Sequence, residues 1–299
     1  MTLIAAEPAA AQAAKPSFAV TRPIHIHSVA LKVRDLPAMT AFYSRIMGMD
    51  VISQNEAESV LGKDGQALFI LKARPSDEPD DGRSAGLFHT AFLMPDRASL
   101  GKWLIFAVKN GVPFTGFSDH LVSEALYLDD PEGNGIEVYA DRAPDTWKWD
   151  GGSVAMATDQ LDIDGLLALT DTHTTNYAKA PDDLRIGHMH LRVGDLEQAD
   201  RFYGGAVGFD PTRKRSGAAF LSSGRYHHHL GINVWQSAGA GPRDDTATGL
   251  AWFSLEVATQ QILEAQTLRL RQAGAPAAAI ADGIETSDPW GTKLRLIKV

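Results

Sequence analysis

The chain has 299 residues, of which 44% are hydrophobic and 22% charged, with no cysteine and a formal net charge of −9. This length suits two domains, and the composition is ordinary for a globular protein. The negative charge argues against binding of a nucleic-acid backbone, which needs a basic face. The absence of cysteine excludes disulfides, iron–sulfur clusters and thiol chemistry.

The N-terminus is rich in alanine and contains two prolines, one acidic residue and one late lysine in MTLIAAEPAAAQAAKPSFAV. A secretory signal needs a basic start and an unbroken apolar stretch, and this segment has neither. No apolar run in the chain approaches the roughly 20 residues of a membrane helix. We therefore predict a disordered lead over residues 1–22, a cytoplasmic protein and no membrane partner.

The next segment changes from a strand pattern to a helix pattern and back. Apolar residues alternate in IHSVALKV, which starts at Ile26 and predicts a strand. Residues 36–46 have helical spacing, with Asp35 as a candidate N-cap and a proline in the first turn. Short strands over residues 50–53, 58–61 and 67–72 complete a βαβββ unit.

This unit recurs along the chain. The first and third copies are nearly superimposable, with LKVRDL from Leu31 and LRVGDL from Leu191, each followed by FY and a Gly-containing stop. The second and fourth copies start at Leu87 and Leu250 and close in a strand after a Pro/Gly turn. We predict an α+β fold of four βαβββ modules. We assign them to two domains, residues 23–142 and 185–299, with a linker over 143–184 that contains a short helix.

From Ile24 onward the chain resembles the vicinal oxygen chelate (glyoxalase/bleomycin resistance/dioxygenase) superfamily. The resemblance rests on the four module openings, on DPEGNGIEVY from Asp130 and on YHHH from Tyr226. Within the superfamily these segments are similar to the type I extradiol dioxygenases of the catechol 2,3-dioxygenase kind. The resemblance implies that paired modules form half-barrels with a divalent metal in the cavity.

Glu137 is the strongest single candidate for a metal ligand. Ile136, Val138 and Ala140 share the apolar face of their strand, so Glu137 points the opposite way. The competing explanation is a solvated acid on an edge strand, but the resemblance puts the superfamily's metal-binding glutamate at this place after the turn. The resemblance also puts a metal-ligating histidine at His89, where the alternative is a hydrogen-bonded core histidine.

An iron site that activates dioxygen needs two histidines and one carboxylate on one face, with open positions for substrate and O₂. His27 has the parity of the helix-facing residues of its strand, which argues against it. His188 has the opposite parity to the apolar residues of its own strand and corresponds to Ser28 of the first module. We predict a metal triad of His89, Glu137 and His188. This triad requires modules two and three to pair across the linker.

Three consecutive histidines lie in YHHHLGINVW, a predicted strand that starts at Tyr226. The resemblance implies an acid–base histidine in this region, and the local pattern favours His228. Strand alternation instead directs His227 and His229 into the cavity. We predict His228 as the acid–base group and His229 as a further active-site group or extra ligand, and the choice among the three stays open.

Two further polar residues are candidates for contact with substrate. Tyr127 lies four residues before Pro131, where the superfamily has a tyrosine that donates a hydrogen bond to a substrate oxygen; a core tyrosine is the alternative. His120 could hydrogen-bond the substrate or cap a turn. In the fourth module the corresponding ligand positions are apolar, Trp or Arg295, so no metal site is expected there.

The resemblance implies an extradiol ring-cleaving dioxygenase that acts on catechol or a substituted catechol with O₂ and uses Fe(II), or alternatively Mn(II). We expect a small aromatic diol and O₂ as partners, no nucleic acid, and a homo-oligomer. Two other functions share this fold. One is a glyoxalase I-like isomerase with Zn or Ni and four protein ligands. The other is a bleomycin-resistance-like binding protein without a metal triad.

Overall fold

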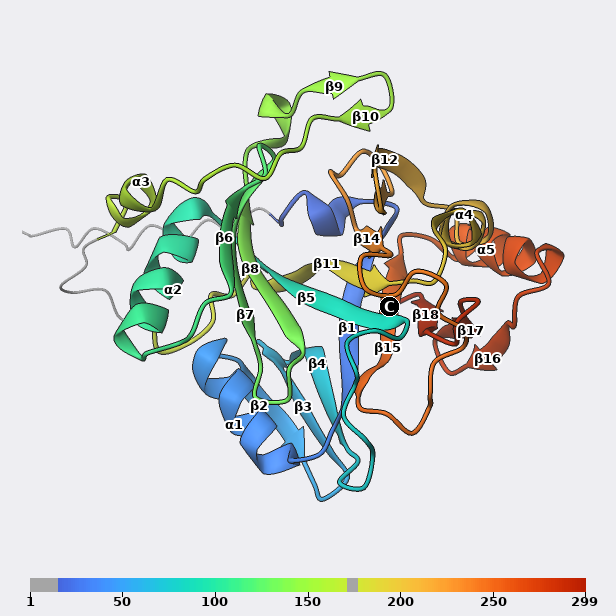
Figure 1. The fold of residues 1–299 in the computed structure, drawn as a ribbon, viewed down its shortest axis with the longest axis horizontal. Coiled ribbons are helices and arrows are strands. Elements are labelled where there is room, and N and C mark those ends of the chain that lie inside the picture. Colours follow the sequence, from blue (N-terminus) through green and yellow to red (C-terminus); the bar gives the residue numbers. More distant parts are fainter. Residues whose placement is uncertain (1–15, 171–176) are drawn as a thin grey trace, which may run out of the picture.

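Two eight-stranded sheets form the framework of the molecule (Figure 1). The computed structural model describes residues 16–170 and 177–299. The first module matches the sequence prediction, with the Asp35 side chain accepting a hydrogen bond from the backbone N–H of Ala38 at the helix N-terminus. Its elements are β1 (Ile24–Val33), α1 (Leu36–Ile46), β2 (Asp50–Gln54), β3 (Glu58–Lys63) and β4 (Gln66–Ala73).

The other three modules repeat the order of one strand, one helix and three strands, with the third module's helix turning π-helical in its second half. The second module contains β5 (Gly86–Met94), α2 (Arg97–Lys109), β6 (Gly116–Asp119), β7 (Ser123–Asp129) and β8 (Gly135–Asp141). The third contains β11 (Arg185–Arg192), α4 (Leu196–Ala199), η3 (Asp200–Ala206), β12 (Asp210–Arg215), β13 (Ala218–Ser222) and β14 (Leu230–Asn233). The fourth contains β15 (Gly249–Val257), α5 (Gln260–Gln272), β16 (Ala278–Ile280), β17 (Gly283–Ser287) and β18 (Lys293–Ile297).

Strand order shows which modules pair. The inner sheet runs β12-β13-β14-β11-β5-β8-β7-β6 and joins modules two and three through antiparallel β5 and β11. The outer sheet runs β16-β17-β18-β15-β1-β4-β3-β2 and joins modules one and four through antiparallel β1 and β15. The predicted α+β fold of four modules in two half-barrels is confirmed, as is the pairing of modules two and three. The ranges proposed as domains are residues 23–142 and 185–299. Each sheet combines one module from the first range with one module from the second.

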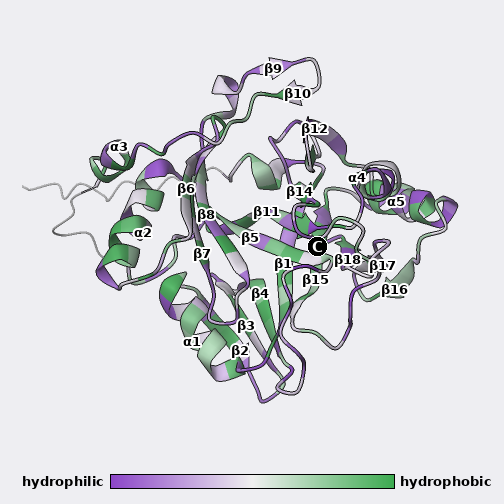
Figure 2. Cartoon of the chain, in the orientation of Figure 1, coloured by the Kyte–Doolittle hydropathy of each residue, from purple (hydrophilic) through white to green (hydrophobic). Residues whose placement is uncertain are grey.

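The core lies between each sheet and its helices. Val29, Leu31, Met189 and Leu191, which face the helices from β1 and β11, are fully buried. Hydrophobic residues run along the central strands, whereas the loops are largely hydrophilic (Figure 2). No helix in the described part of the chain is both long and apolar enough to cross a bilayer.

A buried tyrosine–aspartate pair recurs in both halves of the chain. The Tyr43 hydroxyl donates to the Asp130 carboxylate at 2.8 Å, and the Tyr203 hydroxyl donates to Asp288 at the same distance. Each pair joins the helix of one module to the turn before the last strand of the next module. Burial raises the pKa of Asp130 to about 6 even though this carboxylate accepts several hydrogen bonds.

The linker and the lead contain more structure than the sequence indicates. The predicted linker helix is α3 (Ile163–Leu167), and it is preceded by η2 (Pro144–Thr146) and by a short hairpin of β9 (Trp149–Asp150) and β10 (Ser153–Val154). The predicted disordered lead is wrong at its end, because η1 (Ala19–Thr21) forms a helical turn in which Ala19 is fully buried. Residues 1–15 lie outside the described residues.

Candidate metal centre

A pocket of about 260 Å³ opens on the concave face of the inner sheet. Its polar residues come from β5, β6, β7, β8, β11 and β12, from the turns after β6 and β12 and from the segment before β14. The linker covers one side through residues 156–158. The apolar walls are Phe88, Phe220, Met156 and Trp235. The pocket therefore combines flat aromatic walls with a polar floor, as small-molecule sites commonly do.

The three predicted ligands converge at this floor. One ligand atom from each of His89, Glu137 and His188 lies within 4.8 Å of the others, and all three residues are buried. Oε2 of Glu137 is 3.0 Å from Nε2 of His89 and 3.1 Å from Nε2 of His188. His27, rejected on parity, instead hydrogen-bonds Glu256 at 3.3 Å.

Strand register explains the convergence. Strand β5 lies between β8 and β11, and Ala91 on β5 pairs with Glu137 on one side and with His188 on the other. Paired residues point to the same face of a sheet, so the small methyl side chain of Ala91 leaves space between the two functional groups. Gly135 pairs with His89, and a Cβ there would come within 2.3 Å of the Phe88 carbonyl oxygen. Gly135 therefore permits the close approach of β8 to β5 beside His89, and Ala91 leaves the space between Glu137 and His188.

The electrostatics suit a bound cation. Burial would raise the pKa of Glu137, but the neighbouring His188 and His89 outweigh this effect and hold its pKa well below the usual range. Nε2 of His89 is buried without a properly oriented hydrogen bond, although it lies beside the carboxylate. Two imidazole nitrogens and a carboxylate that converge on one point are the donors that a divalent metal uses. The residues present therefore fit a metal ion.

His228 is the member of the histidine run that enters the pocket. Its Nδ1 lies 2.8 Å from Nδ1 of His227, and Nε2 of His227 lies 2.7 Å from Asp141. The ring of His228 packs on His188 with 4.1 Å between centroids. Burial and the neighbouring histidines hold the pKa of His228 well below its usual value, which favours the neutral ring.

The structure does not bring His229 to the pocket. Its ring points toward the lead, where Nε2 lies 3.0 Å from the Ala19 carbonyl oxygen, and Nδ1 lies 3.1 Å from the Ser222 hydroxyl. Burial lowers the pKa of His229 to about 3. Strand alternation fails here because β14 begins only at Leu230, so the three histidines precede the regular strand.

Tyr127 and His120 both line the pocket and contact each other. Nδ1 of His120 lies 2.7 Å from the Ala157 carbonyl oxygen, which can only accept, so Nδ1 carries the proton. Nε2 of His120 then accepts from the Tyr127 hydroxyl at 2.7 Å. Burial and the Glu137 carboxylate raise the pKa of Tyr127 well above its usual value, so the phenol stays protonated.

Sequence reasoning missed three residues of this site, His190, Arg215 and Asp141, and it did not predict the contact of His227 with Asp141. His190 lines the pocket, and the Asn233 amide lies 3.1 Å from its Nε2. Arg215 is the single arginine or lysine among the described lining residues. The parity that identifies His188 also applies to His190, two residues later, so that signal was present. The parts played by His227 and Asp141 depend on a contact across 86 residues, which no local pattern reveals.

Comparisons with known proteins agree with this architecture. The family profile described as the glyoxalase/bleomycin resistance protein/dioxygenase superfamily matches residues 25–138 and 185–294. A catechol-2,3-dioxygenase of Bacillus subtilis (strain 168) is 38% identical over 270 residues, which cover 89% of this chain and 94% of that protein. A biphenyl-2,3-diol 1,2-dioxygenase 3 of Rhodococcus globerulus is 32% identical over 118 residues, or 37% of this chain and 60% of that protein.

Solved structures share the fold. A putative dioxygenase from Bacillus subtilis superposes with a TM-score of 0.62 at 12% identity, covering 93% of this chain and 86% of that one. Glyoxalase I from Zea mays superposes with a TM-score of 0.58 at 17% identity, covering 94% of each chain. At these identities the likeness establishes the fold alone, because the same scaffold hosts different chemistries.

Proposed function

The chain belongs to the glyoxalase/bleomycin resistance protein/dioxygenase superfamily, and we propose that it is an extradiol dioxygenase that cleaves catechol or a substituted catechol with O₂. The observation that carries this proposal is the cluster of His89, Glu137 and His188 at the floor of an aromatic-walled pocket. The relative that is 38% identical over most of the chain bears a name of the same activity.

The proposed metal ligands are His89, Glu137 and His188, with Fe(II) as the metal and Mn(II) as the alternative. Two imidazoles and one carboxylate form the facial donor set of non-haem iron oxygenases. When bound, such an ion would supply a Lewis acid and a template for the diol and O₂. The protein's own part is to hold the three ligands on one face and to leave the pocket side open.

His228 is the proposed acid–base group. If Nε2 of His227 donates to Asp141, its Nδ1 must accept the Nδ1 proton of His228. The remaining nitrogen of His228, Nε2, then carries a free lone pair. We propose that this nitrogen takes a proton from a substrate hydroxyl and returns it later. Asp141 would stabilise, through His227, the positive charge that His228 acquires. Asp141 and His227 are therefore positioning residues.

Tyr127 and His120 are proposed to steady the substrate. The Tyr127 hydroxyl has one proton, which it donates to His120 in the absence of substrate. A substrate oxygen would therefore replace His120 as the acceptor. His120 stays oriented throughout by its bond to the Ala157 carbonyl oxygen. His229 is not part of this proposal, because it faces the lead.

A glyoxalase I-like activity is less well supported. Such enzymes use four protein ligands, and the fourth would come from the last strand of module three. Glu137 pairs with Ala91, and the equivalent pair in module three is Gly231 with His190. A Cβ at residue 231 would lie 2.9 Å from the His190 ring, so this position cannot supply a second carboxylate. A bleomycin-resistance-like binding protein needs no metal triad, so that function does not account for the convergence of His89, Glu137 and His188.

Metal analysis of anaerobically purified protein, followed by catechol turnover, tests the proposal. We expect one iron or manganese per chain and O₂ uptake with a yellow ring-opened product. Stoichiometric metal without turnover of any catechol, but with isomerase activity on a hemithioacetal, would favour the glyoxalase-like function instead. Protein that binds no divalent metal would contradict both enzymatic functions.

A further inference from the structure

The outer sheet carries residues of a different kind at the positions of the metal triad. Glu137 pairs with Ala91 five residues into β5 from Gly86, and Arg295 pairs with Ser254 at the same offset in β15. By this register Arg295 stands where Glu137 stands in the inner sheet, and Trp252 stands where His89 does. The Arg295 guanidinium lies 3.9 Å from the centroid of the Trp252 ring. The outer sheet therefore has an arginine stacked on a tryptophan at the positions where the inner sheet has a glutamate beside a histidine.

A pocket of about 320 Å³ surrounds this pair on the outer sheet. Its titratable lining consists of six basic and two acidic side chains, which leaves an excess of four positive charges in a chain whose formal net charge is −9. We call it the basic pocket. Its basic residues are Lys32, Lys72, Arg74, Arg243, Lys293 and Arg295, and its acidic residues are Asp245 and Glu285.

Protein carboxylates neutralise only part of this charge. Lys72 pairs with Glu58 at 2.5 Å, and Arg295 pairs with Glu285 at 2.8 Å. The remaining four basic side chains make no ion pair within 4.0 Å in the described part of the chain. Like charges held together in one concavity repel each other, and a concave surface concentrates their field. An anion of several charges would relieve this repulsion.

Among the four basic side chains that make no ion pair, Lys32 gives the strongest argument for a bound anion. Only 8% of the residue is exposed, and the strand register of β1 and β4 places Lys72 directly beside it. Its ammonium donates to the backbone carbonyl oxygen of Asp245 at 2.8 Å and has no carboxylate partner. Burial and the nearby Arg243 lower the pKa of Lys32. A buried, unpaired ammonium is costly unless something of opposite charge offsets it.

Arg243 faces the basic pocket from the loop before β15. Its guanidinium makes no hydrogen bond or ion pair within 4.0 Å to another described residue. Burial lowers its pKa, although the more distant carboxylates of Asp80, Asp288 and Asp245 act in the opposite direction. Trp252 also contributes an indole N–H that is buried without a partner. A guanidinium fork and free N–H donors are the groups that proteins use to bind carboxylate and phosphate oxygens.

We propose that the basic pocket binds a small oxyanion that carries at least two negative charges, held by Lys32 and Arg243 beside the Arg295–Trp252 wall. The ligand is a dicarboxylate or a phosphate, since these share the charge and the acceptor geometry that the pocket supplies. This site is on the other sheet from the proposed catalytic pocket and does not depend on its metal.

Calorimetric titration of the metal-loaded full chain with succinate and with inorganic phosphate, at low and matched ionic strength, tests the proposal. We expect saturable binding of one anion per chain. Lys32→Met and Arg243→Gln should each weaken it about tenfold or more, as expected for loss of a charged hydrogen-bond partner. Arg243→Gln alters a half-buried loop residue, so it remains informative if Lys32→Met perturbs folding.

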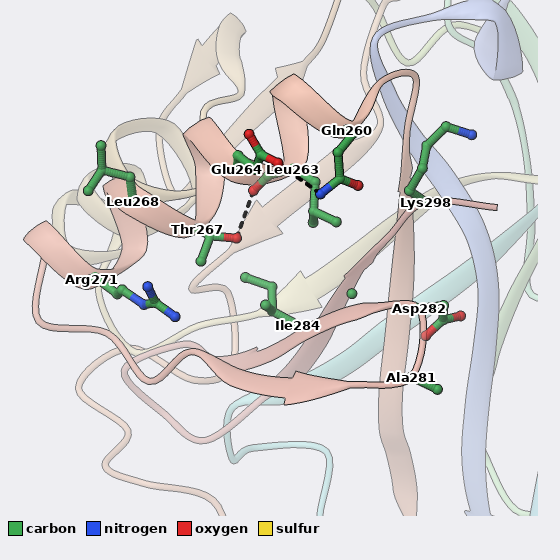
Figure 3. Close-up of a pocket in the computed structure, with 11 residues that line it drawn as sticks. Gln260, Leu263, Glu264, Thr267, Leu268, Arg271, Ala281, Asp282, Ile284 and Lys298 are labelled. Atoms are coloured by element: carbon green, nitrogen blue, oxygen red, sulfur yellow. Dashed lines mark hydrogen bonds between the residues drawn. The ribbon is translucent and has the colours of Figure 1, made fainter.

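A hollow on the far edge of the outer sheet supplies the matched control. It lies between α5 and β17 and has a volume of about 640 Å³ (Figure 3). Its two acidic residues, Glu264 and Asp282, balance its two basic residues, Arg271 and Lys298. Arg271→Gln removes one positive charge from the chain without touching the basic pocket, and should leave anion affinity unchanged.

Binding that falls in Lys32→Met and Arg243→Gln but not in Arg271→Gln would support the proposal. The anion that binds more tightly would then distinguish a carboxylate ligand from a phosphate ligand. No saturable binding of either anion at millimolar concentration, or equal weakening in all three variants, would overturn it. Binding that disappears in His188→Ala would place the anion at the inner sheet and would also overturn it.

Discussion

Glu137 and His188 lie 51 residues apart in the sequence, yet Oε2 of the carboxylate is 3.1 Å from Nε2 of the imidazole. Their strands, β8 and β11, do not pair with each other. Both pair with β5, and Ala91 is the register partner of each residue. The candidate centre is therefore a consequence of module pairing, because it exists only where modules two and three share a sheet.

The first prediction separates the two histidines that compete for the third ligand position. His188→Ala should reduce bound metal at least tenfold, because one of three donors is lost, whereas His27→Ala should leave the metal content unchanged. His27 contacts Glu256 on the outer sheet and has no route to the pocket. Inductively coupled plasma measurement on both purified variants checks this. Metal that survives His188→Ala and falls in His27→Ala would contradict the assignment.

The second prediction concerns the space between the ligands. Ala91 is fully buried and has the parity of His89, so a larger side chain would enter the gap between Glu137 and His188. Ala91→Leu should abolish stoichiometric metal binding although all three ligands remain. We also expect a loss of about 1–3 kcal/mol of stability from overpacking.

Ala91→Ser is the matched control for this substitution. Its side chain is close to alanine in size, so the variant should keep its metal. Metal content measured beside the thermal unfolding midpoint separates a blocked site from a disrupted fold. Full metal occupancy in a folded Ala91→Leu variant would show that the space is not limiting.

Much of this arrangement could be predicted from the sequence because it follows from local periodicity. The helix bounds of the first module follow from the Asp35 cap and the apolar spacing. The parity of His188 in its strand predicts both its orientation and the module pairing. The prediction fails where backbone periodicity ends: His229 and its neighbours precede β14, so alternation has no meaning there. The ordered Ala19 turn was missed because a tertiary contact with His229 holds it.

The third prediction tests the chain of contacts from Asp141 through His227 to His228. His228→Gln should lower kcat about 10²–10⁴-fold at unchanged metal content, as expected for loss of an acid–base group. Asp141→Asn should give a smaller decrease and move the acidic limb of the pH–kcat profile, since the asparagine lacks the charge that stabilises protonated His228. Steady-state kinetics on metal-loaded protein checks both.

His229→Gln provides the comparison within the same run of histidines. Its ring faces Ala19 and Ser222, so this variant should be less stable but should keep its activity per bound metal. A loss of kcat in His229→Gln as large as in His228→Gln would contradict the assignment of acid–base function to the pocket-facing ring.

The fourth prediction uses the buried tyrosine–aspartate pair. The pKa of Asp130 is about 6 in the folded protein, above the ordinary aspartate value of 3.8, because burial disfavours the charged carboxylate. The folded state therefore binds the proton more tightly than the unfolded state does. The stability that this residue contributes is present below about pH 4 and falls as the pH rises to about 6. The total change is up to about 3 kcal/mol.

Asp130→Asn removes this titration. The unfolding free energy of the wild type, relative to that of the variant, should therefore decrease between pH 4.5 and 7, as measured by urea unfolding at fixed salt. Asp288 pairs with Tyr203 in the same way, and burial likewise raises its pKa, so Asp288→Asn should show a difference of the same sign. A difference that grows in favour of the wild type with rising pH would mean that the buried carboxyl is ionised throughout this range. Its hydrogen bonds from Tyr43, Asn134 and the turn backbone would then outweigh its burial.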